Sequence, residues 1–242
     1  MLPRLREAVT DFALLLTKGY ADKSALKLVG DRFSLTQRQR LAVMRSTCSD
    51  QQRLSRRQRQ VSLAALAGQP LAIDGYNLLI TIEAALSGGL IFRGRDGCLR
   101  DLASIHGTYR KVEETIPAVQ LIGDFLTEIA VPRVEGVPPS KRGQDARDTS
   151  VAAILWLLDS PVSNSGRLKT LVGDLARTSC WPWEIRLTIS PDAELSKMDR
   201  IVVSTDSVVL DACVRWTNLA ADLITHRLPA TPVIDLSADL GP

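Results

Sequence analysis

The chain has 242 residues, which is enough for one large domain or two small ones. Its composition, 45% hydrophobic and 24% charged, is that of an ordinary globular protein. No apolar stretch reaches the roughly 18 residues that a membrane-spanning helix needs, and the N-terminus lacks the apolar core of a signal peptide. The four cysteines are scattered and form no CxxC pair, which argues against disulfides or a zinc site. We therefore expect a cytoplasmic protein that does not contact a membrane.

Charge is divided unevenly along the chain. Residues 1–69 hold 13 Lys/Arg and 5 Asp/Glu, a net of +8, whereas residues 70–242 hold 17 and 22, a net of −5. Such a division is typical of a basic module that meets a polyanion, joined to a module that concentrates carboxylates. A well-solvated helical surface would show the same charge pattern, so both interpretations stay open.

Residues 1–68 are expected to form a small, basic, all-helical domain that binds nucleic acid. Apolar residues at helical spacing predict an amphipathic helix that ends near Gly19. A second short helix is predicted from Asp22 to about Val29, and it is expected to stop near Gly30.

Two further helices of this domain carry most of its arginines. Ser34 and Gln37 match a capping box for the first, and Ser49 or Asp50 is expected to cap the second. Two short Arg-rich helices joined by a tight turn are typical of a phosphate-binding unit like the helix-turn-helix. The nucleic-acid-binding candidates are Arg38, Arg40, Arg45, Arg53, Arg56 and Arg57. These residues specify no base and do not distinguish DNA from RNA.

Residues 69–228 alternate short apolar runs with helical patterns. The apolar runs predict strands at 71–74, 90–93, 152–158, 184–189 and 200–204. The patterns between them predict helices at 77–87, 116–129, 165–178, 191–197 and 214–227. This alternation predicts an α/β domain with a mostly parallel sheet and helices on both faces. The polar residues 132–149 are expected to form a flexible loop, and residues 229–242 a loosely held tail.

Three of the predicted strands end in an aspartate. Asp74 closes the first strand in LAIDGYN, Asp159 follows AILWLL, and Asp206 follows RIVVST. Ligands and catalytic groups of parallel sheets lie at the carboxyl ends of the strands. Like charges gathered there repel one another unless a cation or a raised pKa relieves the repulsion. Because hard cations prefer oxygen ligands, the three acids predict a Mg²⁺ or Mn²⁺ site.

Each acid also has a purely structural interpretation. The pair Asp74-Gly75 is typical of a hairpin turn, although residues 78–86 do not alternate as a returning strand would. Asp159 and Asp206 would instead cap the helices that follow them, because acids are favoured at helix N-termini.

Small polar residues beside these acids are candidates for positioning a phosphate. Asn77 lies one helical step after the first acid, and Ser207 directly follows the third. Ser163 and Ser165 fall at the start of the predicted helix 165–178, where free backbone N–H groups favour an anion.

The segment GRDGCLRD places acids and arginines side by side. Its Arg95 and Arg100 are candidates for holding a substrate phosphate, while Asp96 would orient a metal ion or water. The alternative is a surface turn closed by ion pairs.

The motif DGYN after the first strand, together with LLDSPVS and VVSTDS, resembles the PIN/NYN-like nuclease superfamily. The match is closest to the branch in which DGYN ends the first strand, and it covers roughly residues 70–227. The N-terminal segment SALKLVGDRFSLTQRQR resembles a basic helical domain that is fused to such a catalytic-like domain in a bacterial and archaeal family of unknown function.

The resemblance implies a Rossmann-like sheet and metal-dependent hydrolysis of RNA phosphodiesters. By motif, Asp74, Asp159 and Asp206 correspond to the metal-binding acids of the superfamily, and Asn77 to the polar partner of the first acid. Relatives often carry a further acid on a central helix in an ADxxIE-like setting. This chain lacks that segment, so the acids of GRDGCLRD would have to replace it.

Three functions stay open at this point. The first is a metal-dependent ribonuclease, with RNA rather than DNA as the expected partner and the Arg-rich helices as its grip on the backbone. The second, favoured by the missing central acid, is an inactive nuclease-like protein that only binds nucleic acid. The third is a phosphoesterase acting on a small phosphorylated compound, although no GxGxxG or GxxxxGK[ST] loop is present. A homo-oligomer is also left open.

Overall fold

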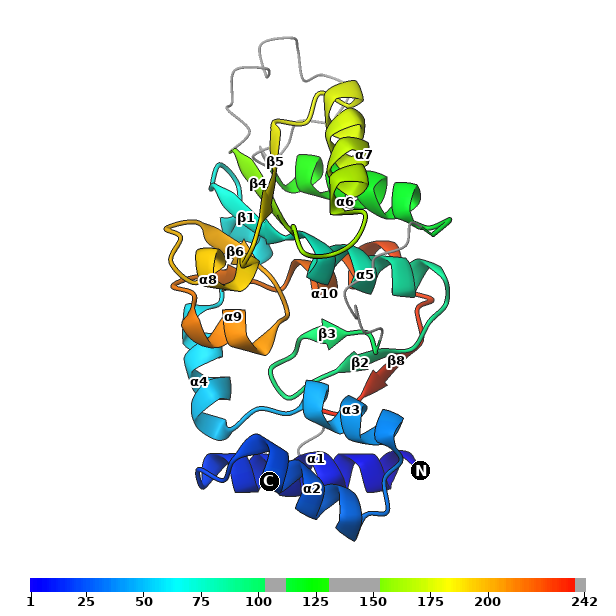
Figure 1. The fold of residues 1–242 in the computed structure, drawn as a ribbon, viewed down its shortest axis with the longest axis vertical. Coiled ribbons are helices and arrows are strands. Elements are labelled where there is room, and N and C mark those ends of the chain that lie inside the picture. Colours follow the sequence, from blue (N-terminus) through cyan, green and yellow to red (C-terminus); the bar gives the residue numbers. More distant parts are fainter. Residues whose placement is uncertain (103–111, 131–152, 238–242) are drawn as a thin grey trace, which may run out of the picture.

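The structure is a computed structural model that describes residues 1–102, 112–130 and 153–237. Its N-terminal part is helical, as predicted, and α1 to α3 pack together at one end of the molecule (Figure 1). Apolar side chains of these helices form a small core that also takes in Phe92 and Leu236 from later in the chain. The helices are α1 (Leu2–Thr17), α2 (Asp22–Arg32), α3 (Gln37–Ser46) and α4 (Asp50–Arg59).

Capping boxes begin both Arg-rich helices. Ser49 and Gln52 form the box of α4, which confirms the expected cap. Thr36 and Gln39 form the box of α3, so the predicted start at Ser34 is wrong by two residues. The reason is that Ser34 has a left-handed φ of 46°, whereas a capping residue needs an extended backbone.

Helix α2 continues past Gly30 to Arg32, contrary to the predicted stop. The glycine has a packing role instead, because a Cβ there would lie 2.1 Å from Nη1 of Arg40. Arg40 uses this space to donate hydrogen bonds to the carboxylate of Asp31 and the carbonyl of Leu35.

The centre of the molecule is a five-stranded sheet in which all neighbouring strands are parallel, in the order β5-β4-β1-β6-β7. One face of the sheet packs against α5, α6, α7 and α10, and the other against α8 and α9. This confirms the predicted α/β class with helices on both faces. The strands are β1 (Leu71–Asp74), β4 (Ile154–Asp159), β5 (Trp183–Thr188), β6 (Ile201–Val203) and β7 (Trp216–Thr217). The helices are α5 (Gly75–Leu86), α6 (Thr115–Ala130), α7 (Ser165–Thr178), α8 (Pro191–Leu195), α9 (Ser207–Ala212) and α10 (Leu219–Arg227).

The predicted helix 214–227 is wrong over its first residues. Trp216 and Thr217 form the edge strand β7, which pairs with β6, and α10 begins only at Leu219. The fully buried Trp216 ring donates a hydrogen bond from Nε1 to the carbonyl of Arg56. In addition, the N–H of Val61 donates to the carbonyl of Trp216 at 2.7 Å, so the chain after α4 is attached directly to this edge.

A second, small sheet joins β8, from the last part of the described chain, to β2 and β3 from its middle, in the order β3-β2-β8. The expected loose tail is wrong for residues 229–237, because β8 pairs in parallel with β2 and Leu236 is buried in the helical core. Residues 238–242 lie outside the described residues. The sequence signal was weak because the strand is only three residues long. The strands are β2 (Ile91–Arg93), β3 (Leu99–Arg100) and β8 (Val233–Asp235). The predicted loop 132–149 lies outside the described residues.

Candidate active site at the carboxyl edge of the sheet

The order of the strands defines one special position in the large sheet. From β1 the chain continues to β4 and β5 on one side, and then crosses to β6 and β7 on the other. Crevices that bind ligands in open α/β sheets lie at such a reversal, beyond the carboxyl ends of the strands. Here that place is formed by Asp74 after β1, Asp159 at the end of β4, and the segment Ser204–Asp206 after β6.

Asp74 is the most buried of these acids, with 8% of its surface exposed. Its Oδ1 accepts a hydrogen bond from the N–H of Asn77, and its Oδ2 accepts one from the hydroxyl of Ser204 at 2.8 Å. Burial first, and then the nearby charges of Asp192 and Asp206, raise its pKa to about 7 against the lowering effect of these hydrogen bonds. A carboxyl group in this state exchanges its proton near neutral pH.

The DGYN motif starts a helix and not a hairpin, because Asp74 is the N-cap of α5. Gly75 is required by close packing: a Cβ there would lie 2.8 Å from the carbonyl oxygen of Leu157 and 2.5 Å from a methyl group of Leu158. The glycine therefore lets the start of α5 approach β4, which fixes Asp74 at the sheet edge.

Asn77 connects two parts of the site. Its Oδ1 accepts hydrogen bonds from both the N–H and the hydroxyl of Thr205, at 2.8 and 3.0 Å. Asn77 was predicted to be the polar partner of Asp74. In the structure it holds the loop after β6 against α5.

Asp206 and Asp159 are both half-buried at this edge. Oδ1 of Asp206 accepts hydrogen bonds from the N–H groups of Val208 and Val209, so the capping interpretation of this acid is confirmed. Burial also raises the pKa of Asp159. Although Asp206 caps α9, it also lies close enough to Asp74 for its charge to raise the pKa of that carboxyl.

Sequence reasoning missed a fourth acid, Asp192. It lies in the first turn of α8, and its pKa is raised by burial and then by the charges of Asp206 and Asp159. The signal was present in SPDAEL, where an acid follows the predicted strand 184–189 and Pro191 opens a helix. The site is therefore a cluster of four carboxylates, Asp74, Asp159, Asp192 and Asp206, which we call the acidic cluster.

The donor atoms of this cluster fit a hard divalent cation by type, since carboxylate and hydroxyl oxygens surround it. Their positions fit less well. Within the described ranges, no group of three or more His, Cys, Asp or Glu side chains stands ready to hold a metal ion. Both oxygens of Asp74 already accept hydrogen bonds. Binding a cation would therefore require the carboxylates to turn towards one another.

The two serines after β4 that were predicted to hold a phosphate, Ser163 and Ser165, differ in their exposure. Ser165 is buried at the start of α7 and donates its hydroxyl hydrogen to the carbonyl of Ser160, whereas Ser163 is exposed. The N-cap of α7 is Asn164, which has a left-handed φ of 69°.

Next to the acidic cluster, two arginines and an aspartate form a buried ionic centre. Asp96 accepts hydrogen bonds from Arg56 at 2.6 Å and from Arg100 at 2.7 and 2.9 Å, and all three side chains are at most 4% exposed. Burial alone would raise the pKa of Asp96, but the charges and hydrogen bonds of the two arginines hold it well below its usual range. Three expectations are corrected here. GRDGCLRD is a turn closed by an ion pair, as one interpretation expected, but it is buried or half-buried and not at the surface. Asp96 is a counter-ion and not a metal ligand, and Arg56 is not available to nucleic acid.

The ionic centre supports the loop that carries Asp206. Nε of Arg100 donates to the carbonyl of Thr205 at 2.7 Å, and Arg56 donates to the carbonyl of Ser207. Arg56 also pairs with Asp211 of α9 at 2.7 Å. Helix α4 thus reaches the candidate active site through fixed charge contacts.

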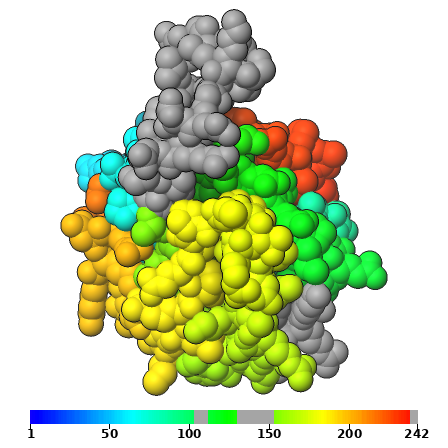
Figure 2. Space-filling model, turned by 90° about the horizontal axis from the view of Figure 1, so that it is seen from above, coloured from blue at the N-terminus to red at the C-terminus, as the bar shows by residue number. Residues whose placement is uncertain are grey.

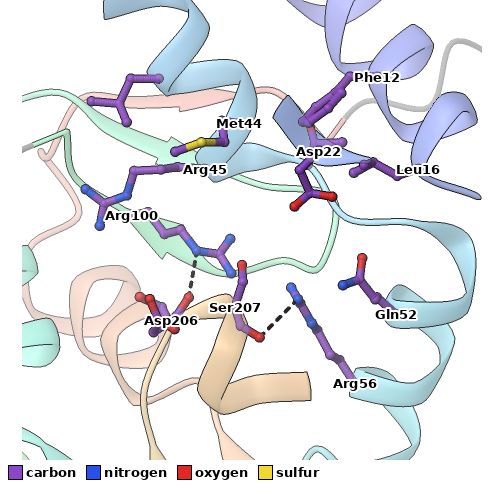
Figure 3. Close-up of a pocket in the computed structure, with 13 residues that line it drawn as sticks. Phe12, Leu16, Asp22, Met44, Arg45, Gln52, Arg56, Arg100, Asp206 and Ser207 are labelled. Atoms are coloured by element: carbon purple, nitrogen blue, oxygen red, sulfur yellow. Dashed lines mark hydrogen bonds between the residues drawn. The ribbon is translucent and has the colours of Figure 1, made fainter. Parts of the chain in front are cut away.

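A pocket of about 440 Å³ lies between the N-terminal helices and this loop (Figure 3). Arg45 of α3, Arg56 of α4 and Arg100 of β3 line it together with Asp206 and Ser207. Apolar side chains of the first and third helices complete its wall: Phe12, Leu16, Leu41 and Met44. The pocket brings Ser207 to the edge of the acidic cluster. Arg100 also lines it, but its three side-chain nitrogens donate to Thr205 and Asp96 and the side chain is 4% exposed, so the prediction that Arg100 holds a substrate phosphate is wrong.

Most of the other arginines predicted to bind nucleic acid have partners within the chain. Arg40 pairs with Asp31, and Arg45 lies 3.5 Å from Asp101. Arg95, predicted to hold a phosphate, donates to the Cys48 carbonyl and to the carboxylate of Asp50. Arg53 is half-buried, whereas Arg38 and Arg57 are exposed. The basic surface is therefore smaller than the sequence predicted.

Comparisons with known proteins divide the chain into two parts, near the point where its net charge changes from positive to negative. Residues 63–137 and 142–222 match the family described as "Domain of unknown function (DUF5616)", and residues 4–59 match "Protein of unknown function (DUF434)". Over 206 residues the chain is 26% identical to the uncharacterized protein MJ0935 of Methanocaldococcus jannaschii, covering 85% of this chain and 88% of the relative. No solved structure matches.

No helix within the described ranges has the length and apolar character to cross a membrane.

Proposed function

This chain belongs to the DUF5616 family, and we propose that it is a metal-dependent ribonuclease that hydrolyses RNA phosphodiesters at the acidic cluster. The observation that carries the proposal is the convergence of Asp74, Asp159, Asp192 and Asp206 where the strand order reverses. The resemblance of DGYN, LLDSPVS and VVSTDS to PIN/NYN-like nucleases supports the same reaction.

The charges of the cluster explain why a cation belongs there. Carboxylates that raise one another's pKa lose stability in the ionised state, and a divalent cation between them would restore it. Asp74, Asp192 and Asp206, with Asp159 beside them, would hold Mg²⁺ or Mn²⁺. When bound, such an ion lowers the pKa of a water molecule and neutralises charge on the phosphate.

The chain's own residues prepare this arrangement. Ser204 and the N-terminal turn of α5 hold the Asp74 carboxyl in place, and Asn77 fixes the neighbouring loop through Thr205. Because these contacts are made within the chain itself, they hold the site residues in place for the substrate.

The pocket beside the cluster suits one nucleotide of the substrate. It has an apolar wall for a base, with Phe12 and Met44 on it, and cationic and hydroxyl groups for a phosphate, with Arg45 and Ser207 on it. The exposed Arg38 and Arg57 would add sequence-independent, salt-sensitive contacts with the RNA backbone.

The test is cleavage of labelled single-stranded RNA by the full chain in Mn²⁺. Asp74→Asn and Asp192→Asn are expected to abolish cleavage, while Asp199→Asn, a change at a side chain that is 98% exposed, should not affect it. If both variants cleave RNA as fast as the wild type, the proposal is refuted. Binding of RNA without cleavage, unchanged in Asp74→Asn, would instead indicate an inactive binding protein.

A second candidate is a phosphoesterase that acts on a small phosphorylated compound. The specific observation in its favour is the pocket of about 440 Å³ between the N-terminal helices and the loop after β6, a volume in the range of small-molecule sites. Assaying mononucleotides and simple phosphoesters under the same conditions distinguishes the two: rapid turnover of these compounds with intact RNA would favour the small substrate.

A further inference from the structure

One edge of the large sheet, opposite β7, is β5, a six-residue strand with the sequence WEIRLT. Within the described residues β5 pairs with β4 alone. Together with α7 it contributes to the yellow and yellow-green face turned to the viewer in Figure 2. Edges that stay unpaired are usually short or carry lysine, proline or charges of one sign, whereas β5 is six residues long, contains no lysine or proline, and carries one charge of each sign, Glu184 and Arg186. We propose that two copies of this chain associate through this edge, with β5 antiparallel to its counterpart, to form a two-fold symmetric dimer.

The hydrogen bonds of β5 determine how its edge can pair. The carbonyls of Pro182 and Thr188 accept hydrogen bonds from N–H groups on the β4 side. Because backbone groups alternate in direction along a strand, those of Trp183, Ile185 and Leu187 point to the open edge. A two-fold axis therefore passes beside Ile185, which exchanges two backbone hydrogen bonds with the partner's Ile185.

This register brings opposite charges together on the face that carries α8. Glu184 lies opposite the partner's Arg186, and symmetry repeats the pair. Both residues are exposed in the single chain. Arg186 already contacts Glu194 at 2.9 Å, but a guanidinium has five N–H donors and can bind a second carboxylate. Opposite residues that exchange no backbone bonds have Cα atoms about 4.5 Å apart, so their side chains meet.

The same register fills a groove on the α7 face. Trp181, Trp183 and Ile185 line this groove of about 510 Å³, with Gly173 on its α7 wall. The partner's Leu187 would lie opposite Trp183 and enter it. Nothing lies within 4 Å of the place where a Cβ of Gly173 would be, so the helix leaves room. Strand pairing stops at Trp183, whose N–H already donates to the carbonyl of Trp181.

Disulfide trapping tests this register in the full chain. The exposed Cys180 is first changed to serine, which leaves three buried cysteines. In that background Ile185→Cys should form an intermolecular disulfide under mild oxidation, because opposite Cα atoms lie about 5.5 Å apart. Leu187→Cys is the matched control: the two copies of this residue are offset by four positions, about 13 Å, and should not cross-link.

Light scattering after size-exclusion chromatography supplies the second readout. The wild-type chain should be a dimer, and Glu184→Arg should weaken it by about tenfold, because both cross-strand pairs become repulsive. Asp199→Arg, an equal change of charge at an exposed site, should leave it intact. A wild-type monomer at the highest soluble concentration overturns the proposal. So does a dimer that Glu184→Arg does not weaken, or one in which Leu187→Cys cross-links as well as Ile185→Cys.

Discussion

Replacing Asp74 by asparagine keeps the shape of the buried side chain and removes its charge. In the folded chain the pKa of Asp74 is about 7, against 3.8 for an ordinary aspartate carboxyl. Between these values the unfolded chain has lost the proton and the folded chain keeps it, so wild-type stability falls as pH rises. Above pH 7 the carboxyl is ionised in both the folded and the unfolded chain, so its unfavourable contribution to the free energy of folding no longer changes with pH. Three pKa units correspond to about 4 kcal/mol, which is an upper bound for this carboxyl.

The variant lacks this titration, so the two stabilities should diverge with pH. Near pH 4 Asp74→Asn should match the wild type or be less stable by up to about 1 kcal/mol, because its amide accepts fewer hydrogen bonds. Near pH 8 it should be more stable by about 2–4 kcal/mol. Urea unfolding followed by tryptophan fluorescence, without divalent metal, measures both. Parallel pH profiles for the two proteins would refute the burial argument, and Asp199→Asn should follow the wild type throughout.

Three further predictions concern the framework of the site. Gly75→Ala should cost about 1–3 kcal/mol in chemical denaturation, because the new methyl group meets the Leu157 carbonyl, whereas Gly173→Ala should stabilise the chain by up to about 1 kcal/mol. Equal effects would contradict the packing argument. Asp96→Asn should destabilise the chain by about 3–5 kcal/mol, since it leaves two arginines without their buried counter-ion. A near-neutral result in the same assay would contradict the ionic centre. In the presence of Mn²⁺, thermal unfolding at pH 8 should shift upwards for the wild type and not for Asp192→Asn; equal shifts would show that Asp192 does not bind the ion.

The parts of the fold that the sequence predicted are those with strong local signals. Continuous apolar runs identified β1, β4 and β6, and the absence of alternation after Asp74 predicted a helix rather than a hairpin. The short strands β7 and β8 carry little periodicity, and they form because partners elsewhere in the chain pair with them.

The site was predictable where its residues follow strands and unpredictable where distant charges meet. Asp74, Asp159 and Asp206 end or follow strands, and topology alone gathers them. Asp192 begins an unremarkable helix, so only the position of α8 brings it to the cluster. Arg56 lies on a polar helix and was assigned to the surface, because its partner Asp96 is 40 residues away in the sequence.

Calorimetric titration of the full chain with Mn²⁺ at pH 6, in two buffers of different ionisation enthalpy, tests the acidic cluster most directly. Because the pKa of Asp74 is about 7, this carboxyl is mostly protonated at pH 6 and must release its proton to the buffer when a cation binds. The wild type should therefore bind Mn²⁺ with release of up to about one proton, and Asp74→Asn should bind far more weakly. Saturable binding with no proton release, or equal binding by both proteins, would contradict a cation site at Asp74.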